Sequence, residues 1–288
     1  MDKTAGPQVI SYSNIEQRDL WAAEAELWVR EAARFDAMNG AFGRAVLEAS
    51  GLHPGERVLD VGCGNGATTL GAAERVAPGG EAVGVDIVAP MLGLARSRAD
   101  AAGLRNVQFL EADAQTHEFE QGEFDAVISR FGVMFFGDPE AAFTNLGHAL
   151  GSGGRLSIVC WQDVLQSEWT AVIGGAAAAH LGFPDFGPPG APGPFAFADR
   201  ERLERTVRSA GFGDITIETI TRPMWLGEDA EDVIRFFTSL DIVREWFAGK
   251  PQDKVDLAIE AVREALGPYA DPRGIGMSGT AWLLSARR

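Results

Sequence analysis

The sequence predicts an α/β fold in which a largely parallel sheet is covered by helices on both faces. Short apolar strands alternate with helices from Arg57 to Trp161, a pattern typical of parallel βαβ units. The first strand ends in a glycine-rich turn, Gly62–Gly66. Ile215–Ile220 and Gly276–Ala286 alternate apolar and polar residues, as antiparallel strands do. We therefore expect a doubly wound, seven-stranded sheet with an antiparallel last strand.

Helices are expected before the first strand. Residues Asn14–Ser50 carry apolar side chains at steps of three and four, which places them on one helical face. These side chains are Trp21, Ala25, Trp28, Ala32 and Phe35. A separate helix is expected over Gly40–Ala49.

The alternating region supplies five strands and three helices. The expected strands are Arg57–Val61, Glu81–Asp86, Val107–Ala112, Phe124–Ser129 and Arg155–Trp161. The expected helices are Thr68–Val76, Met91–Ala102 and Pro139–Leu150.

After Trp161 the alternation ends, and helices are inserted around the last two strands. The expected helices are Gln166–Leu181, Ala198–Gly211 with Gly211 as its stop, Ala230–Phe247 and Gln252–Leu266. The run Gly182–Pro194 is rich in proline and glycine and is expected to be a loop. No linker is evident, so one domain spans 1–288, with N-terminal lid helices in 1–50, a ligand-binding core in 51–161 and cap helices with the sheet's completion in 162–288.

Composition excludes several classes of partner. The 288-residue chain has a net charge of −16, and a field of that sign repels phosphate backbones, so nucleic acid is not an expected partner. Cys63 and Cys160 show neither metal spacing nor a disulfide framework, which favours a reducing cytoplasm and no metal. No membrane span and no apolar leader at Met1–Pro7 are expected. Monomer and homodimer both stay open.

The turn after the first strand carries the chemistry. Glycine lets the backbone turn tightly and approach a ligand, and the following helix N-terminus offers free N–H groups to an anion. Asp86, at the end of the second strand, can accept both hydroxyls of a ribose. Gly62, Gly64 and Ala67 also satisfy the dinucleotide pattern. The turn alone therefore indicates only an adenosine-containing ligand.

Five motifs in order resemble class I S-adenosylmethionine (SAM)-dependent methyltransferases. Val58–Gly66, VLDVGCGNG, resembles motif I. The others are Gly84–Ile87 (ribose turn), Glu111–Ala114 (adenine turn), Phe124–Phe131 (motif II) and Gly153–Ile158 (motif III). The resemblance implies a Rossmann-like fold, SAM as cofactor with S-adenosylhomocysteine (SAH) as product, and a small-molecule acceptor, as in the ubiquinone- and menaquinone-biosynthesis type.

The resemblance also implies which residues contact the cofactor. The three glycines of the turn would line the methionine end of SAM, with Asp60 beneath the turn. Asp86 would bind the ribose hydroxyls of SAM, and Asp113 would accept a hydrogen bond from its adenine amino group. Asp60 and Asp113 could instead brace or cap their own turns. Met91 could instead pack in the core. The full expected set is Asp60, Gly62, Gly64, Gly66, Asp86, Ile87, Met91, Asp113, Ala114 and Ser129.

The acceptor pocket is expected from parts that this chain adds to the common core. Its expected residues are Tyr12, Trp21, Trp28, Arg130, Phe131, Met134 and Trp161. Methyl transfer by in-line displacement depends mainly on proximity and orientation, and a base is needed only for a protonated acceptor. Catalytic residues stay unassigned, with His117 and Arg130 as weak candidates.

Two other functions use the same fold. One is a SAM- or SAH-binding protein that catalyses a non-methylation reaction or none, which the sequence leaves open. The other is an NAD(P)-dependent oxidoreductase. The motifs after the third and fourth strands argue against the oxidoreductase, as does the absence of an evident hydride-transfer set.

Overall fold

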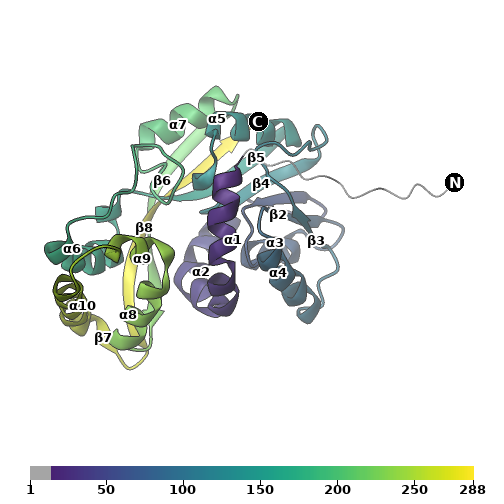
Figure 1. Cartoon of the computed structure of the whole chain (residues 1–288). Coiled ribbons are helices and arrows are strands. Elements are labelled where there is room, and N and C mark those ends of the chain that lie inside the picture. Colours follow the sequence, from purple (N-terminus) through teal and green to yellow (C-terminus); the bar gives the residue numbers. More distant parts are fainter. Residues whose placement is uncertain (1–13) are drawn as a thin grey trace.

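The centre of the protein is a twisted sheet with helices on both faces (Figure 1). The computed structural model describes residues 14–288, so Tyr12 lies outside the described residues. The strands are ordered β3-β2-β1-β4-β5-β8-β6, and a two-residue strand, β7, pairs with β8. The pairs within β1–β5 are parallel, whereas β8 runs antiparallel to its neighbours. The predicted doubly wound fold is confirmed.

The strands of the alternating region lie close to their predicted bounds, and the later ones are longer. β5 begins at Leu150 because its glycine-rich start pairs with the beginning of β4. β6 continues past Ile220 because its ladder with β8 runs to Gly227. The strands are β1 Arg57–Val61, β2 Glu81–Asp86, β3 Val107–Glu111, β4 Phe124–Arg130, β5 Leu150–Trp161, β6 Gly213–Gly227, β7 Ala270–Asp271 and β8 Gly274–Arg287.

The helices differ from expectation chiefly where one becomes two. The first break falls at Glu31 rather than before Gly40, and Leu240 is extended, which separates α8 from α9. A π-helical turn, Thr170–Gly174, precedes α6. The helices are α1 Ile15–Arg30, α2 Ala32–Ala49, α3 Ala67–Val76, α4 Ala89–Ala101, α5 Pro139–Ala149, α6 Gly175–Leu181, α7 Arg200–Ser209, α8 Ala230–Ser239, α9 Asp241–Phe247 and α10 Gln252–Leu266.

Two apolar cores cover the two faces of the sheet. One includes Phe42 of α2 and continues into α8 and α10; the other includes Phe143 of α5 and Leu203 of α7. Helices α6, α8, α9 and α10, here called the cap, gather beyond the β6–β8 end of the sheet, and α1 lies between the cap and α4 (Figure 1). No helix within residues 14–288 is long and apolar enough to cross a membrane.

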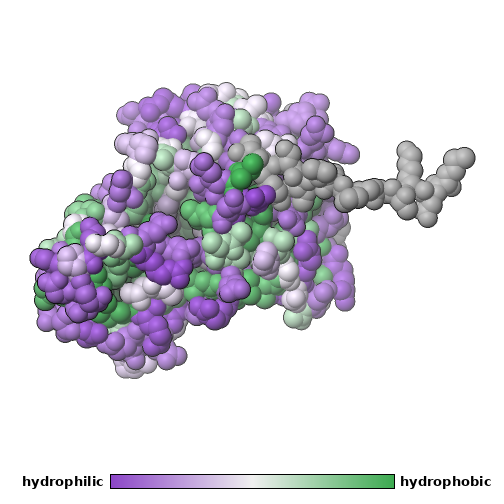
Figure 2. Space-filling view, viewed as in Figure 1, coloured by the Kyte–Doolittle hydropathy of each residue, from purple (hydrophilic) through white to green (hydrophobic). Residues whose placement is uncertain are grey.

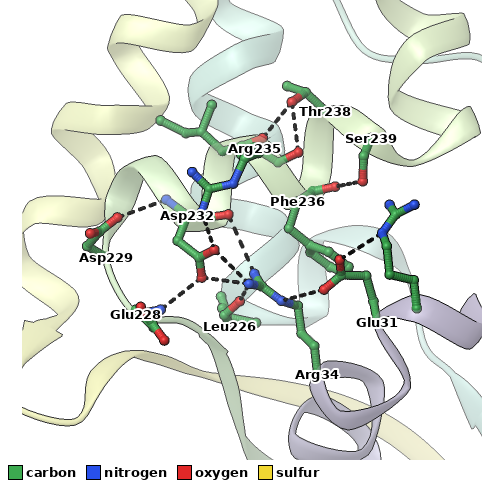
Figure 3. Close-up of polar contacts among 12 residues, drawn as sticks. Glu31, Arg34, Leu226, Glu228, Asp229, Asp232, Arg235, Phe236, Thr238 and Ser239 are labelled. Atoms are coloured by element: carbon green, nitrogen blue, oxygen red, sulfur yellow. Dashed lines mark hydrogen bonds and ion pairs between the residues drawn. The ribbon is translucent and has the colours of Figure 1, made fainter. Parts of the chain in front are cut away.

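A polar cluster holds the cap against α2 (Figure 3). The Arg34 guanidinium donates through Nη2 to both carboxylate oxygens of Asp232 at 2.7 Å and through Nη1 to the Leu226 carbonyl at 3.1 Å. Its Cζ lies 4.6 Å from the ring centroid of Phe236. Both charged side chains of the pair are largely buried, so this contact fixes the position of α8 relative to the core.

Candidate functional site

A cavity of about 870 Å³ lies where the parallel strands β1–β5 end. In doubly wound folds ligands bind outside the carboxyl ends of the strands. One part of the cavity is lined by the turns after β1, β2 and β3, and the other part by α1, α8 and α9. Hydrophobic surface, green in Figure 2, gathers where α1 crosses between the core and the cap. The cavity therefore joins the glycine turn to an apolar chamber.

The three glycines of the turn have left-handed backbone angles but different surroundings. Their φ values are +65°, +51° and +81° for Gly62, Gly64 and Gly66. A Cβ on Gly62 would lie 2.7 Å from the Gly132 Cα, and one on Gly66 would lie 2.8 Å from the Ala95 Cβ. Gly62 and Gly64 line the cavity, whereas Gly66, which does not, permits close packing between turn and helix.

Asp86 lines the cavity at the end of β2. Its carboxylate accepts hydrogen bonds from the Gly64 N–H at 2.8 Å and the Val88 N–H at 3.0 Å. Burial raises the pKa of Asp86 to about 6, although these backbone N–H groups act in the opposite direction. The group is thus a half-buried hydrogen-bond acceptor that also fixes the glycine turn.

This pKa predicts pH-dependent ligand binding. Ribose hydroxyls donate more strongly to a carboxylate than to a protonated acid, so SAH affinity is expected to fall as the pH drops below about 6, by up to about tenfold per pH unit. The measurement is the SAH dissociation constant from pH 5 to 8. Asp60, whose pKa burial raises to about 7, titrates in the same range. Asp86→Asn is therefore the control; a parallel pH dependence in both proteins would contradict the role of Asp86.

Asp60 and Ser129 brace the turn from beneath. Asp60 is buried and accepts from the Thr69 hydroxyl at 2.7 Å. The Ser129 hydroxyl donates to the Val61 carbonyl at 2.7 Å and accepts from the Gly132 N–H at 3.2 Å. Neither residue lines the cavity. Their contacts fit the bracing role rather than direct ligand contact by their side chains.

Asp113 anchors the start of α1. The Asn14 side-chain amide donates to both Asp113 oxygens at 2.9 Å, and its Oδ1 accepts from the Gly137 N–H at 2.6 Å. Asp113 and Ala114 line the cavity. Because Asn14 already occupies both oxygens, the carboxylate has less capacity left for an adenine amino group. Ile87 and Met91, the other expected adenine contacts, also line the cavity.

Aromatic side chains form a continuous wall from β4 into the cap. Phe131 stacks on Trp161 with centroids 4.0 Å apart, and Trp169 follows at 6.2 Å from Trp161. Trp169 in turn stacks on Phe237 of α8 at 5.5 Å. Phe131 has a φ of +64°, a costly angle for a bulky residue that positions its ring at the cavity.

The other acceptor-pocket residues expected from the sequence lie on the same cavity, apart from Tyr12, which is outside residues 14–288. Trp21 meets Trp28 edge to face at 5.3 Å and Phe135 at 4.9 Å. The Met134 sulfur accepts from the Trp161 N–H at 3.3 Å. The sequence predicted cap helices in this part of the chain but named none of their side chains; α8 and α9 add Phe236, Phe237 and Trp246. Their aromatic density was a usable signal, but nothing local placed them beside the glycine turn.

Charged groups in the lining are mostly acidic. The lining carboxylates are Glu24, Asp36, Asp86, Asp113, Asp185, Asp241 and Glu245, whereas Arg130 is the one basic residue among the described lining residues. No histidine of the part of the chain that the structure describes lines the cavity, and the His117 ring packs edge-on against Phe119. Within residues 14–288 no cluster of His, Cys, Asp or Glu could hold a metal ion.

This lining fits a SAM-type cofactor. Asp86 presents acceptors at a strand end, and a Cβ on Gly64 would meet nothing nearer than the Met91 sulfur at 3.8 Å, so the backbone is open to a close ligand. Arg130 makes no hydrogen bond or ion pair with the described residues. Asp86 offers hydrogen-bond acceptors for a ribose, the turn at Gly64 is open, and Arg130 is an unpaired cation. Together these features fit an adenosine that carries an amino-acid group.

Comparison with known proteins identifies the family. A methyltransferase domain family matches residues 52–173. The nocamycin O-methyltransferase of Saccharothrix syringae is 30% identical over 259 residues, which cover 82% of this chain and 88% of that protein. The chain belongs to the SAM-dependent methyltransferase family. SAM, the cofactor expected from the sequence, is the cofactor of this family.

Other relatives match this methyltransferase over a shorter span. The aklanonic acid methyltransferase DauC of Streptomyces sp. is 36% identical over 145 residues, 48% of this chain and 66% of that protein. The chain therefore spans just under two thirds of that relative. A phosphoethanolamine N-methyltransferase 2 structure from Haemonchus contortus has a TM-score of 0.54 at 22% identity, covering 96% of this chain and 58% of that one. At this identity the structural likeness supports the fold alone.

Proposed function

We propose that this protein transfers a methyl group from SAM to an oxygen atom of an apolar, ring-containing small molecule. The observation that carries the proposal is the shared cavity, in which the glycine turn and Asp86 open directly onto the aromatic wall. The choice of oxygen rests on the nocamycin O-methyltransferase, the relative matched over most of its length. Pockets that bind drug-sized ligands measure about 300–1,000 Å³, and this cavity of about 870 Å³ lies at the upper end of that range.

Each part of the lining has a role in this proposal. Asp86 accepts from the ribose hydroxyls, Ile87 and Met91 pack against the adenine, and Gly62 and Gly64 approach the methionine end. Asp60 and Ser129 keep the turn in shape through Thr69 and Val61. The domain then divides as the sequence predicts, with the cofactor held by the core and the acceptor by the lid and cap.

The proposed chemistry needs few protein groups. When bound, SAM supplies a methyl group that its sulfonium already activates. The wall of Phe131, Trp161 and Trp169 orients the acceptor and excludes water, and such positioning can lower a barrier by about 7–11 kcal/mol. No imidazole is among the described residues that line the cavity, so the methyl acceptors that need least assistance carry an acidic hydroxyl, such as an enol or a phenol.

The test is a turnover assay with methyl-labelled SAM and a panel of acceptors. We expect labelled product from apolar ring compounds with an acidic hydroxyl, and none from aliphatic amines or thiols. Binding of SAH without transfer to any member would favour the alternative, a SAM-binding protein with another activity. No binding of SAH would contradict the proposed function itself.

Loss of the Trp161 ring, the centre of the aromatic wall, should weaken binding of the methyl acceptor but not of SAH. Trp161→Leu removes the ring that stacks on Phe131 and is expected to raise the acceptor KM about tenfold, because an aromatic pair contributes about 1 kcal/mol beyond its area. SAH affinity should stay within about twofold of wild type, because Trp161 is proposed to contact the methyl acceptor and not the cofactor. Trp282→Leu, outside the cavity, is the control, and equal effects of both substitutions would contradict this role.

A further inference from the structure

Arg130 is a half-buried cation with no paired counter-ion among the described residues. It follows Ser129 at the end of β4 and lines the cavity, yet no described residue forms a hydrogen bond or ion pair with its guanidinium. None of its nitrogens is among the fully buried atoms that lack a partner, so these unpaired nitrogens keep accessible surface. A guanidinium that is partly removed from water is costly unless an anion pairs with it. The arrangement therefore selects for an anionic ligand group.

The nearby carboxylates are engaged elsewhere. Asp36 pairs with Arg98, and Asp60 accepts from Thr69. Both act on Arg130 through space, as does the like charge of Arg98, and burial is the main reason that the pKa of Arg130 is lowered. The protein therefore places negative charge around the guanidinium but leaves its hydrogen-bonding fork free.

The guanidinium lies at the methionine end of the proposed cofactor site. The Arg130 Nη1 and the Thr68 hydroxyl are both 3.6 Å from the point where a Cβ on Gly43 would sit. Thr68 belongs to the first turn of α3, directly after the glycine turn, where backbone N–H groups have no intrahelical partner. The Arg130 guanidinium thus lies beside the first turn of α3. The only carboxylate of SAM belongs to its methionine part.

We infer that Arg130 binds the carboxylate of the SAM methionine moiety and so positions the cofactor. The inference rests on the proposed function, since it requires SAM or SAH at the glycine turn. A planar fork can bind a carboxylate with two parallel hydrogen bonds, which fixes orientation as well as position. Arg130 is then a cofactor-positioning residue rather than the acceptor contact expected from the sequence.

The experiment is a cycle of two ligands and two proteins, measured by calorimetry. The ligands are SAH and decarboxylated SAH, which keeps the adenosine, thioether and amine but lacks the carboxylate. The proteins are wild type and Arg130→Gln. We expect Arg130→Gln to weaken SAH binding about 10- to 100-fold, as for a charge-assisted pair, and to leave binding of decarboxylated SAH within about twofold.

Three further measurements make the result decisive. Arg105→Gln, which removes an exposed charge of the same kind, should bind both ligands as wild type does. Arg130→Lys, which keeps the charge but loses the fork, should give an intermediate SAH affinity. Thermal unfolding without ligand should show that Arg130→Gln is folded and no less stable than wild type, because it removes an unpaired, half-buried charge.

The outcomes separate the inference from the function on which it rests. Failure of the wild type to bind SAH would overturn the proposed function. Normal SAH binding by wild type with equal losses for both ligands in Arg130→Gln would overturn the inference alone. Unchanged SAH affinity together with a raised acceptor KM would also overturn it and would assign Arg130 to the acceptor instead.

Discussion

Asp86→Ala is expected to weaken SAH binding by about two to three orders of magnitude. Each hydrogen bond to a charged group contributes about 1.5–3 kcal/mol, and the carboxylate is proposed to accept from both ribose hydroxyls. The substitution also removes the acceptor for the Gly64 and Val88 N–H groups, so the turn loses its fixed shape. Both effects reduce affinity, and titration calorimetry measures their sum.

Two variants test whether the loss is specific. Asp100→Ala removes a carboxylate that is 76% exposed on α4 and should leave SAH affinity unchanged. Asp86→Asn keeps one oxygen acceptor and should bind SAH more tightly than Asp86→Ala but more weakly than wild type. A folded Asp86→Ala protein with wild-type affinity would show that the adenosine does not lie at the end of β2.

The core of this fold is predictable because its signals are local. Glu81–Asp86 has its predicted bounds since a buried strand needs only an apolar run closed by turn residues. Gly62, Gly64 and Gly66 take positive φ values, as a tight strand-to-helix turn requires. The motif order also predicts Asp86, Asp113 and Ser129 at the ends of successive strands, where β2, β3 and β4 end.

The features that the sequence did not predict depend on distant contacts. The break between α8 and α9 coincides with a hydrogen bond from the Asp241 N–H to Glu24, 217 residues away in the chain. Asp113 is held by Asn14 across 99 residues. No periodicity or propensity in either segment encodes such a partner, because both are set by tertiary packing. The acceptor side of the cavity, which these contacts shape, was for the same reason the least predictable part.

Arg34→Met should destabilise the protein by about 3 kcal/mol, since it leaves the largely buried Asp232 carboxylate without its main partner. Arg235 also pairs with Asp232 at 2.6 Å, which places the expected loss at the lower end of the range for broken buried pairs. The measurement is urea unfolding at neutral pH, where Asp232, whose pKa is lowered by its partners, is ionised. Arg30→Met, on the neighbouring helix α1 and largely exposed, should change stability by less than about 0.5 kcal/mol.

Arg34→Met should also affect acceptor binding and cofactor binding to different extents. Arg34 holds α8, which carries Phe236 and Phe237 on the cavity, whereas the glycine turn and Asp86 belong to the core. A loosened α8 is therefore expected to raise the acceptor KM about tenfold or more while SAH affinity changes less than threefold, because ordering α8 again on binding costs free energy. Equal stability of Arg34→Met and Arg30→Met would show that apolar packing alone holds the cap. A parallel loss of SAH affinity would show that cap and turn move as one unit.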